Sequence, residues 1–194
     1  MKGVVYVELL ELLDDLHSME FTEQVIEEAG VVSGGAYNAL GQFDELEFVA
    51  LTGAYQHLVG HEITEELYEL GERVVRRCIL DYPRLFPDHG TLADTLERME
   101  SLIYLKGALY ETDTTTHQDY IDQISPNQMV LNHHGDPHLT EFTAALIHGC
   151  AAHHHIHADV HCLPVNQTGT HTTRYLITLS EIKHGRLGSL QTAV

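Results

Sequence analysis

The spacing of apolar residues changes once along this chain, close to residue 110, and that change restricts the folds open to it. Up to Gly107 the apolar residues recur every three or four positions, as on one face of a helix. The first helix is predicted from a stripe formed by Val4, Val5, Leu9, Leu12, Leu13 and Leu16. Four more helices are predicted. They run from Thr22 to Gly30, from Asp44 to Gly60, from Thr64 to residue 80, and from Thr91 to Gly107.

After Glu111 the chain becomes rich in threonine, asparagine and serine, which favours strands and turns. Two short strands are predicted around Ser125-Pro126, and two more over residues 155–165 and 171–180. Between them, Asp136-Pro137 indicates a helix start, because an acidic N-cap precedes a proline at the first helical position. We therefore predict one α+β domain over residues 1–194. It has a helical N-terminal lobe (1–107) and a C-terminal lobe (108–194) with three or four antiparallel strands.

Composition excludes several partners. The formal net charge of −19 argues against nucleic acid and against an anionic membrane surface. No apolar run is long enough to span a bilayer, and the N-terminus is predicted to be an amphipathic helix rather than a signal peptide. The three cysteines cannot form a disulfide framework, so we expect a cytoplasmic protein.

Histidines are concentrated in the C-terminal third. Ten of the 16 histidines lie between residues 133 and 171, and no lysine or arginine occurs from 107 to 173. Imidazole and thiolate are preferred zinc ligands. His161 and Cys162 lie near the end of one predicted strand, His171 begins the next, and His138 begins the helix. These four residues form a possible tetrahedral site for zinc or a similar divalent metal.

Two other interpretations of the histidines stay open. They are either surface residues without a specific role, or groups whose titration near pH 6.5 offsets the acidic charge and alters association. An enzyme has little support, because the chain lacks a glycine-rich phosphate loop, an HExxH motif and a nucleophile elbow. Cys162 and His161 are adjacent in a predicted strand, where neighbouring side chains point to opposite faces. They are therefore not expected to act as a catalytic thiol–imidazole pair.

Local sequence and the order of elements together resemble the H-NOX family, the heme-nitric oxide/oxygen binding domains. The matching segments span nearly the whole chain, and they are MKG at the N-terminus, AGV (29–31), LTGAYQHLVG (51–60), ITEELYELGERVV (63–75), DYPRLF (81–86) and ALIHG (145–149). The resemblance implies the H-NOX fold, a heme b cofactor and a diatomic gas ligand. It also implies a signalling partner in trans, namely a diguanylate cyclase, a phosphodiesterase or a histidine kinase.

The chain departs from the family pattern at the heme pocket. The resemblance places Ile103 where the family has its iron-ligating histidine, and isoleucine has no lone pair to donate. The family's Tyr-x-Ser-x-Arg motif, which holds the heme propionates, is replaced by residues 132–136, with Asp136 in the arginine's place. An aspartate there repels a propionate. Cys78 falls at the position of a bulky distal-pocket side chain, and Leu9 is expected opposite it.

We therefore predict a non-enzymatic sensory domain that relays the state of a ligand or cofactor to a partner protein, without the usual histidine ligation of heme. If heme binds, the candidate replacement ligands are Tyr104, His117 and His133. The alternative is a heme-free regulatory protein that holds zinc through its C-terminal histidines and cysteine, with the old pocket collapsed around Ile103, Cys78 and Leu9.

Overall fold

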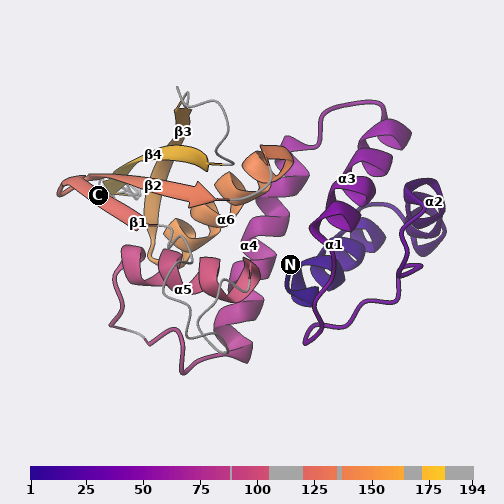
Figure 1. Cartoon of the computed structure of the whole chain (residues 1–194), viewed down its shortest axis with the longest axis horizontal. Coiled ribbons are helices and arrows are strands. Elements are labelled where there is room, and N and C mark those ends of the chain that lie inside the picture. Colours follow the sequence, from indigo (N-terminus) through magenta and orange to yellow (C-terminus); the bar gives the residue numbers. More distant parts are fainter. Residues whose placement is uncertain (88, 105–119, 135–136, 164–171, 182–194) are drawn as a thin grey trace, which may run out of the picture.

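Five helices precede the sheet among the residues that the structure describes, as the apolar spacing predicts. The computed structural model describes residues 1–87, 89–104, 120–134, 137–163 and 172–181 (Figure 1). The helices of the first part are α1 (Gly3–Leu16), α2 (Met19–Ala29), α3 (Glu45–Val59), α4 (Thr64–Asp81) and α5 (Leu92–Tyr104). The predicted stripe of α1 is buried except at Leu16, which is 44% exposed at the end of the helix.

The predicted helix boundaries hold at some ends and fail at others. Asp44 caps α3 by accepting a hydrogen bond from the Leu46 amide at 3.0 Å. Thr91 and Asp94 exchange hydrogen bonds as a capping box at the start of α5. Two predicted caps are wrong. The cap of α2 is Ser18 rather than Thr22, and Thr64 is the first residue of α4, after an N-cap at Ile63.

The C-terminal part is a four-stranded antiparallel sheet with one long helix against it. The strands are β1 (Tyr120–Ser125), β2 (Gln128–His134), β3 (Ile156–Leu163) and β4 (Thr172–Glu181), in the order β1-β2-β4-β3. A single 3-10 turn, η1 (Pro137–Leu139), leads from Pro137 into α6 (Thr140–His153). The predicted helix start near Pro137 is therefore confirmed as this short turn, while Asp136 lies outside the described residues.

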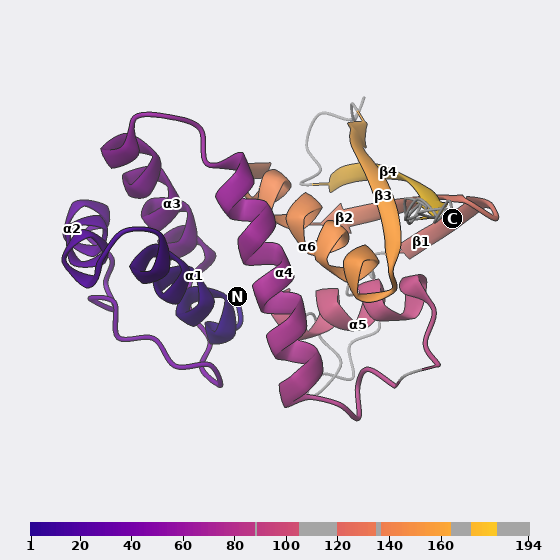
Figure 2. The same ribbon diagram turned by 180° about the vertical axis from the view of Figure 1, so that it is seen from behind.

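The elements divide in space between α3 and α4 rather than at residue 107. Helices α1, α2 and α3 lie on one side, and α5, α6 and the sheet lie on the other, with α4 between them (Figures 1 and 2). Helix α4 packs far more extensively on α6 than on α1. By its packing, the fourth helix therefore belongs with the C-terminal elements.

Glycines allow α4 and α6 to approach at backbone distance. A Cβ atom added at Gly71 would lie 2.4 Å from the Ala145 carbonyl oxygen, and one at Gly149 would lie 2.8 Å from the Gly71 oxygen. No larger residue fits at either position without moving a helix. One apolar core runs from α1 through this contact to the inner face of the sheet. Within the described residues, no helix is both long and apolar enough to cross a membrane.

Candidate functional site

Ile103, at the predicted ligand position, is completely buried at the end of α5. Its side chain has 0% exposure and belongs to the apolar core. Its carbonyl oxygen accepts a hydrogen bond from the backbone N–H of Lys2 at 2.7 Å. This bond joins the last turn of α5 to the start of α1, so Ile103 is held from both its side chain and its backbone.

A carboxylate and an imidazole are buried together one turn before Ile103. Glu100 Oε1 of α5 and His133 Nδ1 of β2 are joined by a hydrogen bond, which is an ion pair when the imidazole is protonated, and their whole-residue exposures are 8% and 1%. Helical spacing places Glu100 on the same side of α5 as Ile103 and Tyr104. The pair therefore links α5 to the sheet inside the core.

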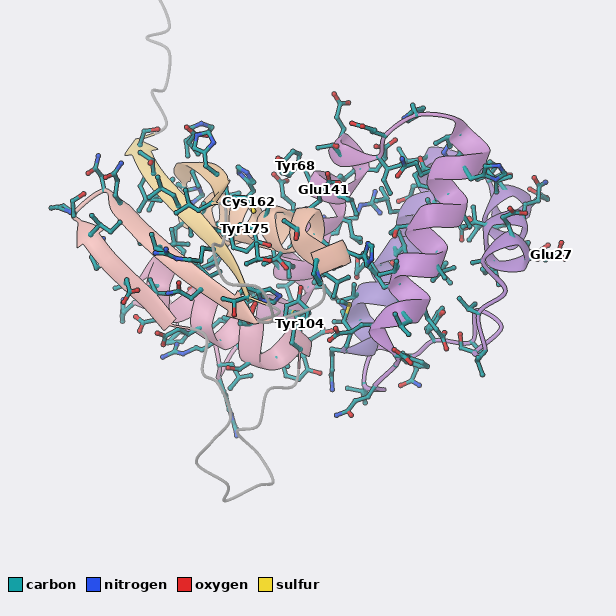
Figure 3. All side chains as sticks on the ribbon, turned by 45° about the horizontal axis from the view of Figure 1, so that its top comes forward. Glu27, Tyr68, Tyr104, Glu141, Cys162 and Tyr175 are labelled. Atoms are coloured by element: carbon teal, nitrogen blue, oxygen red, sulfur yellow. The ribbon has the colours of Figure 1, made fainter. Side chains whose placement is uncertain are left out.

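Two tyrosines surround this pair. The Tyr104 ring centroid lies 5.0 Å from the His133 ring, and its hydroxyl is 2.9 Å from Thr143 Oγ1 of α6. The Tyr175 ring of β4 lies 6.4 Å from His133, and its hydroxyl donates to the Thr140 carbonyl at 3.0 Å. Burial is the main cause that raises the pKa of both phenols, so both stay neutral at neutral pH. Figure 3 labels both tyrosines on their elements.

The space beside Glu100 is very small. A cavity of about 10 Å³ lies between α5, β2 and α6. Its lining is mostly apolar and consists of Leu96, Met99, Glu100, Leu131, Thr143, Leu146, Ile147 and Cys150. A volume of roughly 10–15 Å³ is the least that holds one water molecule. The core is thus nearly filled by side chains here.

Leu9 and Cys78 are also core residues, with exposures of 3% and 0%. Burial, with Asp81 and Glu8 nearby, raises the pKa of the Cys78 thiol to about 12. Burial likewise raises the pKa of Cys150 on α6, with a further contribution from Cys78. Both thiols therefore stay protonated and unreactive at neutral pH.

The predicted metal site receives no support from the residues that the structure describes. His171 lies outside them, as does His117. His161 and Cys162 are exposed on β3, and His161 Nε2 lies 3.2 Å from the carboxylate of Asp159 on the same strand. His138 is exposed on η1. Over the described ranges, no group of three or more histidine, cysteine, aspartate or glutamate side chains is placed to hold a metal ion.

Sequence reasoning missed Glu100, although a signal was present. In α5 the positions Leu92, Leu96, Met99 and Ile103 are apolar and buried, and Glu100 interrupts that buried face. A carboxylate on an apolar helix face needs a partner in the core. His133 was considered only as a replacement heme ligand, and its pairing across 33 residues of sequence could not be read from local pattern.

The fold is shared with solved H-NOX proteins. The Fe(II) unliganded H-NOX protein from K. algicida is 18% identical, with a TM-score of 0.75 over 95% of this chain and 99% of that one. The H-NOX protein from S. oneidensis in its Fe(II)NO state is 17% identical, with a TM-score of 0.70 over 93% of this chain and 100% of that one. The A71G mutant of the K. algicida H-NOX protein is 19% identical to this chain, with a TM-score of 0.74 over 93% of this chain and 97% of that one. These likenesses define an H-NOX fold.

The sequence places the chain in a family as well. It matches the haem-NO-binding family over residues 2–162, which is most of its length, so the chain belongs to the H-NOX family. Domains of this family are heme-binding gas sensors rather than enzymes. No curated protein sequence matches the chain significantly.

The described residues do not fit a histidine-ligated heme. Ile103, which the sequence resemblance predicts at the ligand position, offers no donor atom, and it is packed in the core without exposure. The cavity beside Glu100, between α5, β2 and α6, measures about 10 Å³, whereas a ligand of drug size needs a pocket of roughly 300–1,000 Å³. Larger hollows of about 370 and 400 Å³ are lined by α4 with α6 and by residues 61–66, and Ile103 lines neither of them. His133, a candidate replacement ligand, is bound to Glu100 in the same core.

Proposed function

We propose that this chain is a signalling domain of the H-NOX type that works without histidine-ligated heme and relays its state through contact with a partner protein. The observation that carries the proposal is Ile103. Its side chain is apolar and fully buried, and the sequence resemblance predicts it at the position where the family has its iron ligand. The nearly filled cavity beside Glu100, one turn before Ile103 on α5, supports the same conclusion.

Family membership supports the signalling part of the proposal. H-NOX domains pair with signalling proteins, and the partner classes expected here are a diguanylate cyclase, a phosphodiesterase or a histidine kinase. A domain that keeps the family's fold without its iron–histidine bond retains the surfaces for such a partner. A diatomic gas is then no longer the expected input, because gas binding in the family uses heme iron.

Absorption spectroscopy tests the heme part. The untagged chain is purified from cells supplied with a heme precursor, beside the K. algicida H-NOX protein prepared identically as a positive control. We expect a Soret band near stoichiometric strength from the control only. A stoichiometric band from this chain contradicts the proposal. Metal analysis of the same sample adds a separate outcome, since about one equivalent of zinc supports the heme-free metal-binding alternative.

A partner assay tests the relay. Purified histidine kinase, diguanylate cyclase and cyclic-dinucleotide phosphodiesterase from the same genome are assayed with increasing amounts of this domain. We expect a saturable change in autophosphorylation or cyclic dinucleotide synthesis with one of them. If no candidate kinase, cyclase or phosphodiesterase responds to the domain, the relay part of the proposal is wrong.

A further inference from the structure

Helix α4 carries an exposed stripe between the side that contacts α1 and the side that contacts α6. Its members follow one another at four-residue intervals, which places them along one ridge of the helix: Tyr68, Glu72, Arg76 and Leu80. The two end members expose apolar surface, because Tyr68 is 41% exposed and Leu80 is 69% exposed. The stripe therefore has two charges at its centre and an apolar side chain at each end.

The two charged members of the stripe are available to a partner. One position along α4, Arg73 forms an ion pair at 2.9 Å with Glu69, four residues before it. Glu72 and Arg76 have the same spacing and order, yet neither forms an ion pair or a hydrogen bond with another residue that the structure describes. On a chain with a net charge of −19, this surface is locally neutral, so a second copy of the chain is not repelled here.

A hollow of about 370 Å³ lies beside the C-terminal half of the stripe, between α4 and α6. Its lining includes Ile79 and Leu80 of α4 and Ala152 of α6. Tyr68 leans toward α6 at the other end of the stripe, because its ring packs edge-on against His148 of α6 with 4.8 Å between the centroids. A protruding aromatic ring and a hollow thus lie on the same side of the stripe, at opposite ends.

The order of residues along the stripe is self-complementary. Its midpoint is level with Val74: Glu72 and Arg76 lie at equal intervals before and after it, and so do Tyr68 and Leu80. A two-fold axis through this midpoint, perpendicular to the stripe, maps the stripe onto itself in reverse. Each acid then faces the base of the other copy, and each tyrosine faces the leucine.

This symmetry also fits the way in which helices pack. Ridges of residues at four-residue spacing pack against each other when two helices cross at roughly 50°. The axis keeps α6 on the same side of the stripe in both copies, so the Tyr68 ring of each copy lies over the hollow of the other. The hollow has room for an aromatic side chain. Tyrosine and arginine are also the residues that most often anchor protein interfaces.

We propose that two copies of this chain form a two-fold symmetric dimer through α4, in which Tyr68 of each copy enters the hollow between α4 and α6 of the other and Glu72 of each copy pairs with Arg76 of the other. The close contact of Gly71 with Gly149 makes α4 and α6 one rigid surface for this purpose. The inference goes beyond the proposed function, because pairing of two copies requires neither heme nor a signalling partner.

Sedimentation velocity of the full untagged chain tests the dimer, at about 0.15 M salt and from about 1 to about 300 µM protein. We expect a reversible monomer–dimer equilibrium. Glu72→Arg and Arg76→Glu each place like charges opposite one another, so each is expected to raise the Kd of the dimer at least about tenfold. Tyr68→Ala is expected to do the same by emptying the hollow. Glu27→Arg makes the same charge change on exposed α2, well away from Tyr68 (Figure 3), and is expected to leave the Kd unchanged.

Charge reversal on both sides gives the sharpest test. The double variant Glu72→Arg/Arg76→Glu again sets opposite charges across the axis, so its Kd is expected to return close to the wild-type value. A mixture of the two single variants is expected to form mixed dimers, because one copy then carries two cations and the other two anions.

Three results overturn the dimer. The first is a monomer at every concentration, and the second is a dimer whose Kd neither single reversal changes, since the contact then lies on another surface. The third is a double variant that dimerises no better than the single ones. Circular dichroism of each variant checks that these exposed substitutions leave the fold intact. Loss of the dimer leaves the heme and partner assays unaffected, so the proposed function stands or falls separately.

Discussion

The backbone N–H of Lys2 donates to the carbonyl oxygen of Ile103 at 2.7 Å, which joins the start of α1 to the end of α5. The same residue that lacks a metal-binding atom in its side chain thus connects the two ends of the helical part. A substitution at Ile103 therefore affects the packing of the core around its side chain and, through the backbone bond to Lys2, the position of α1.

Restoring the family's histidine at this position is expected to fail. Ile103→His places a polar ring in a fully buried apolar site, which costs about 1–3 kcal/mol without a new partner, and it creates no room for a porphyrin. We expect a lower midpoint in urea unfolding and no Soret band when heme is added. Ile103→Val is the control and costs about 0.5–1.5 kcal/mol. Stoichiometric heme binding by the histidine variant would show that the pocket opens readily.

The buried pair predicts a non-additive effect on stability. His133→Leu removes the imidazole partner of the buried Glu100 carboxylate, and we expect a loss of about 3–5 kcal/mol in the free energy of unfolding. The double variant Glu100→Leu/His133→Leu replaces both groups with apolar ones of similar size, so most of that loss is expected to be recovered. Urea unfolding of both single variants and the double variant measures the coupling, and additive losses contradict it.

The Tyr104 hydroxyl is expected to contribute through Thr143. Tyr104→Phe removes one partner of a buried hydrogen bond, which costs about 1–3 kcal/mol because the threonine hydroxyl loses one of its partners. Combining it with Thr143→Val removes both polar groups and is expected to cost less than the sum of the single changes. Thermal unfolding of the three variants checks this, and equal stability of Tyr104→Phe and wild type argues against the bond.

Replacement by alanine is expected to have opposite effects at Gly71, which lies in the α4–α6 contact, and at Gly53, which lies outside it on α3. Gly71→Ala forces a Cβ atom against the Ala145 carbonyl, with a loss of about 1–3 kcal/mol. Gly53→Ala on α3 meets no atom within 4 Å and is expected to stabilise the chain by about 0.5–1 kcal/mol. Urea unfolding compares them, and a neutral Gly71→Ala would mean that the helices separate easily.

Thiol reactivity follows from burial. Cys78 has its pKa raised to about 12 and Cys150 also has a raised pKa, while Cys162 is exposed on β3. A thiol reagent at about pH 8 is therefore expected to modify Cys162 quickly in the native chain and the other two only after unfolding. Labelling of Cys78 at the rate of Cys162 in the native chain contradicts the structure.

The same two thiols give a pH dependence of stability. Their folded pKa values lie above the unfolded value of about 8.5, so the folded state favours the neutral form. Their contribution is complete below about pH 8.5 and declines as the pH rises toward the folded pKa. Cys78→Ala/Cys150→Ala is expected to flatten the decline in stability above pH 8.5 in urea unfolding.

Much of the fold was accessible from the sequence because its signals are local. Asp44, Gly60 and the Thr91–Asp94 box mark helix ends through bonds to residues a few positions away. Thr22 and Thr64 were wrong as caps because Ser18 and Ile63 occupy those positions, and a threonine inside the first turn carries nearly the same local signal. The assignment of α4 to the N-terminal lobe followed sequence order, whereas its packing follows Gly71 and Gly149.

The candidate site was less accessible because its contacts are non-local. Ile103 and Cys78 could be placed in the core through the family resemblance. The partnership of Glu100 with His133 depends on how α5 lies against β2, which no local pattern encodes. The predicted set of four metal ligands remains a prediction as a whole, because His171 lies outside the described residues. The other three members, His138, His161 and Cys162, are exposed.

The glycine contact between α4 and α6 also determines how motion travels through this molecule. Side chains between two helices act as a compliant layer that absorbs small shifts by changing rotamers. Gly71 and Gly149 have no side chains to form such a layer, so α4 and α6 move together as one rigid unit. A displacement that begins at the sheet is therefore delivered to α1 with little loss along α4, which spans the molecule between its two groups of elements (Figure 2).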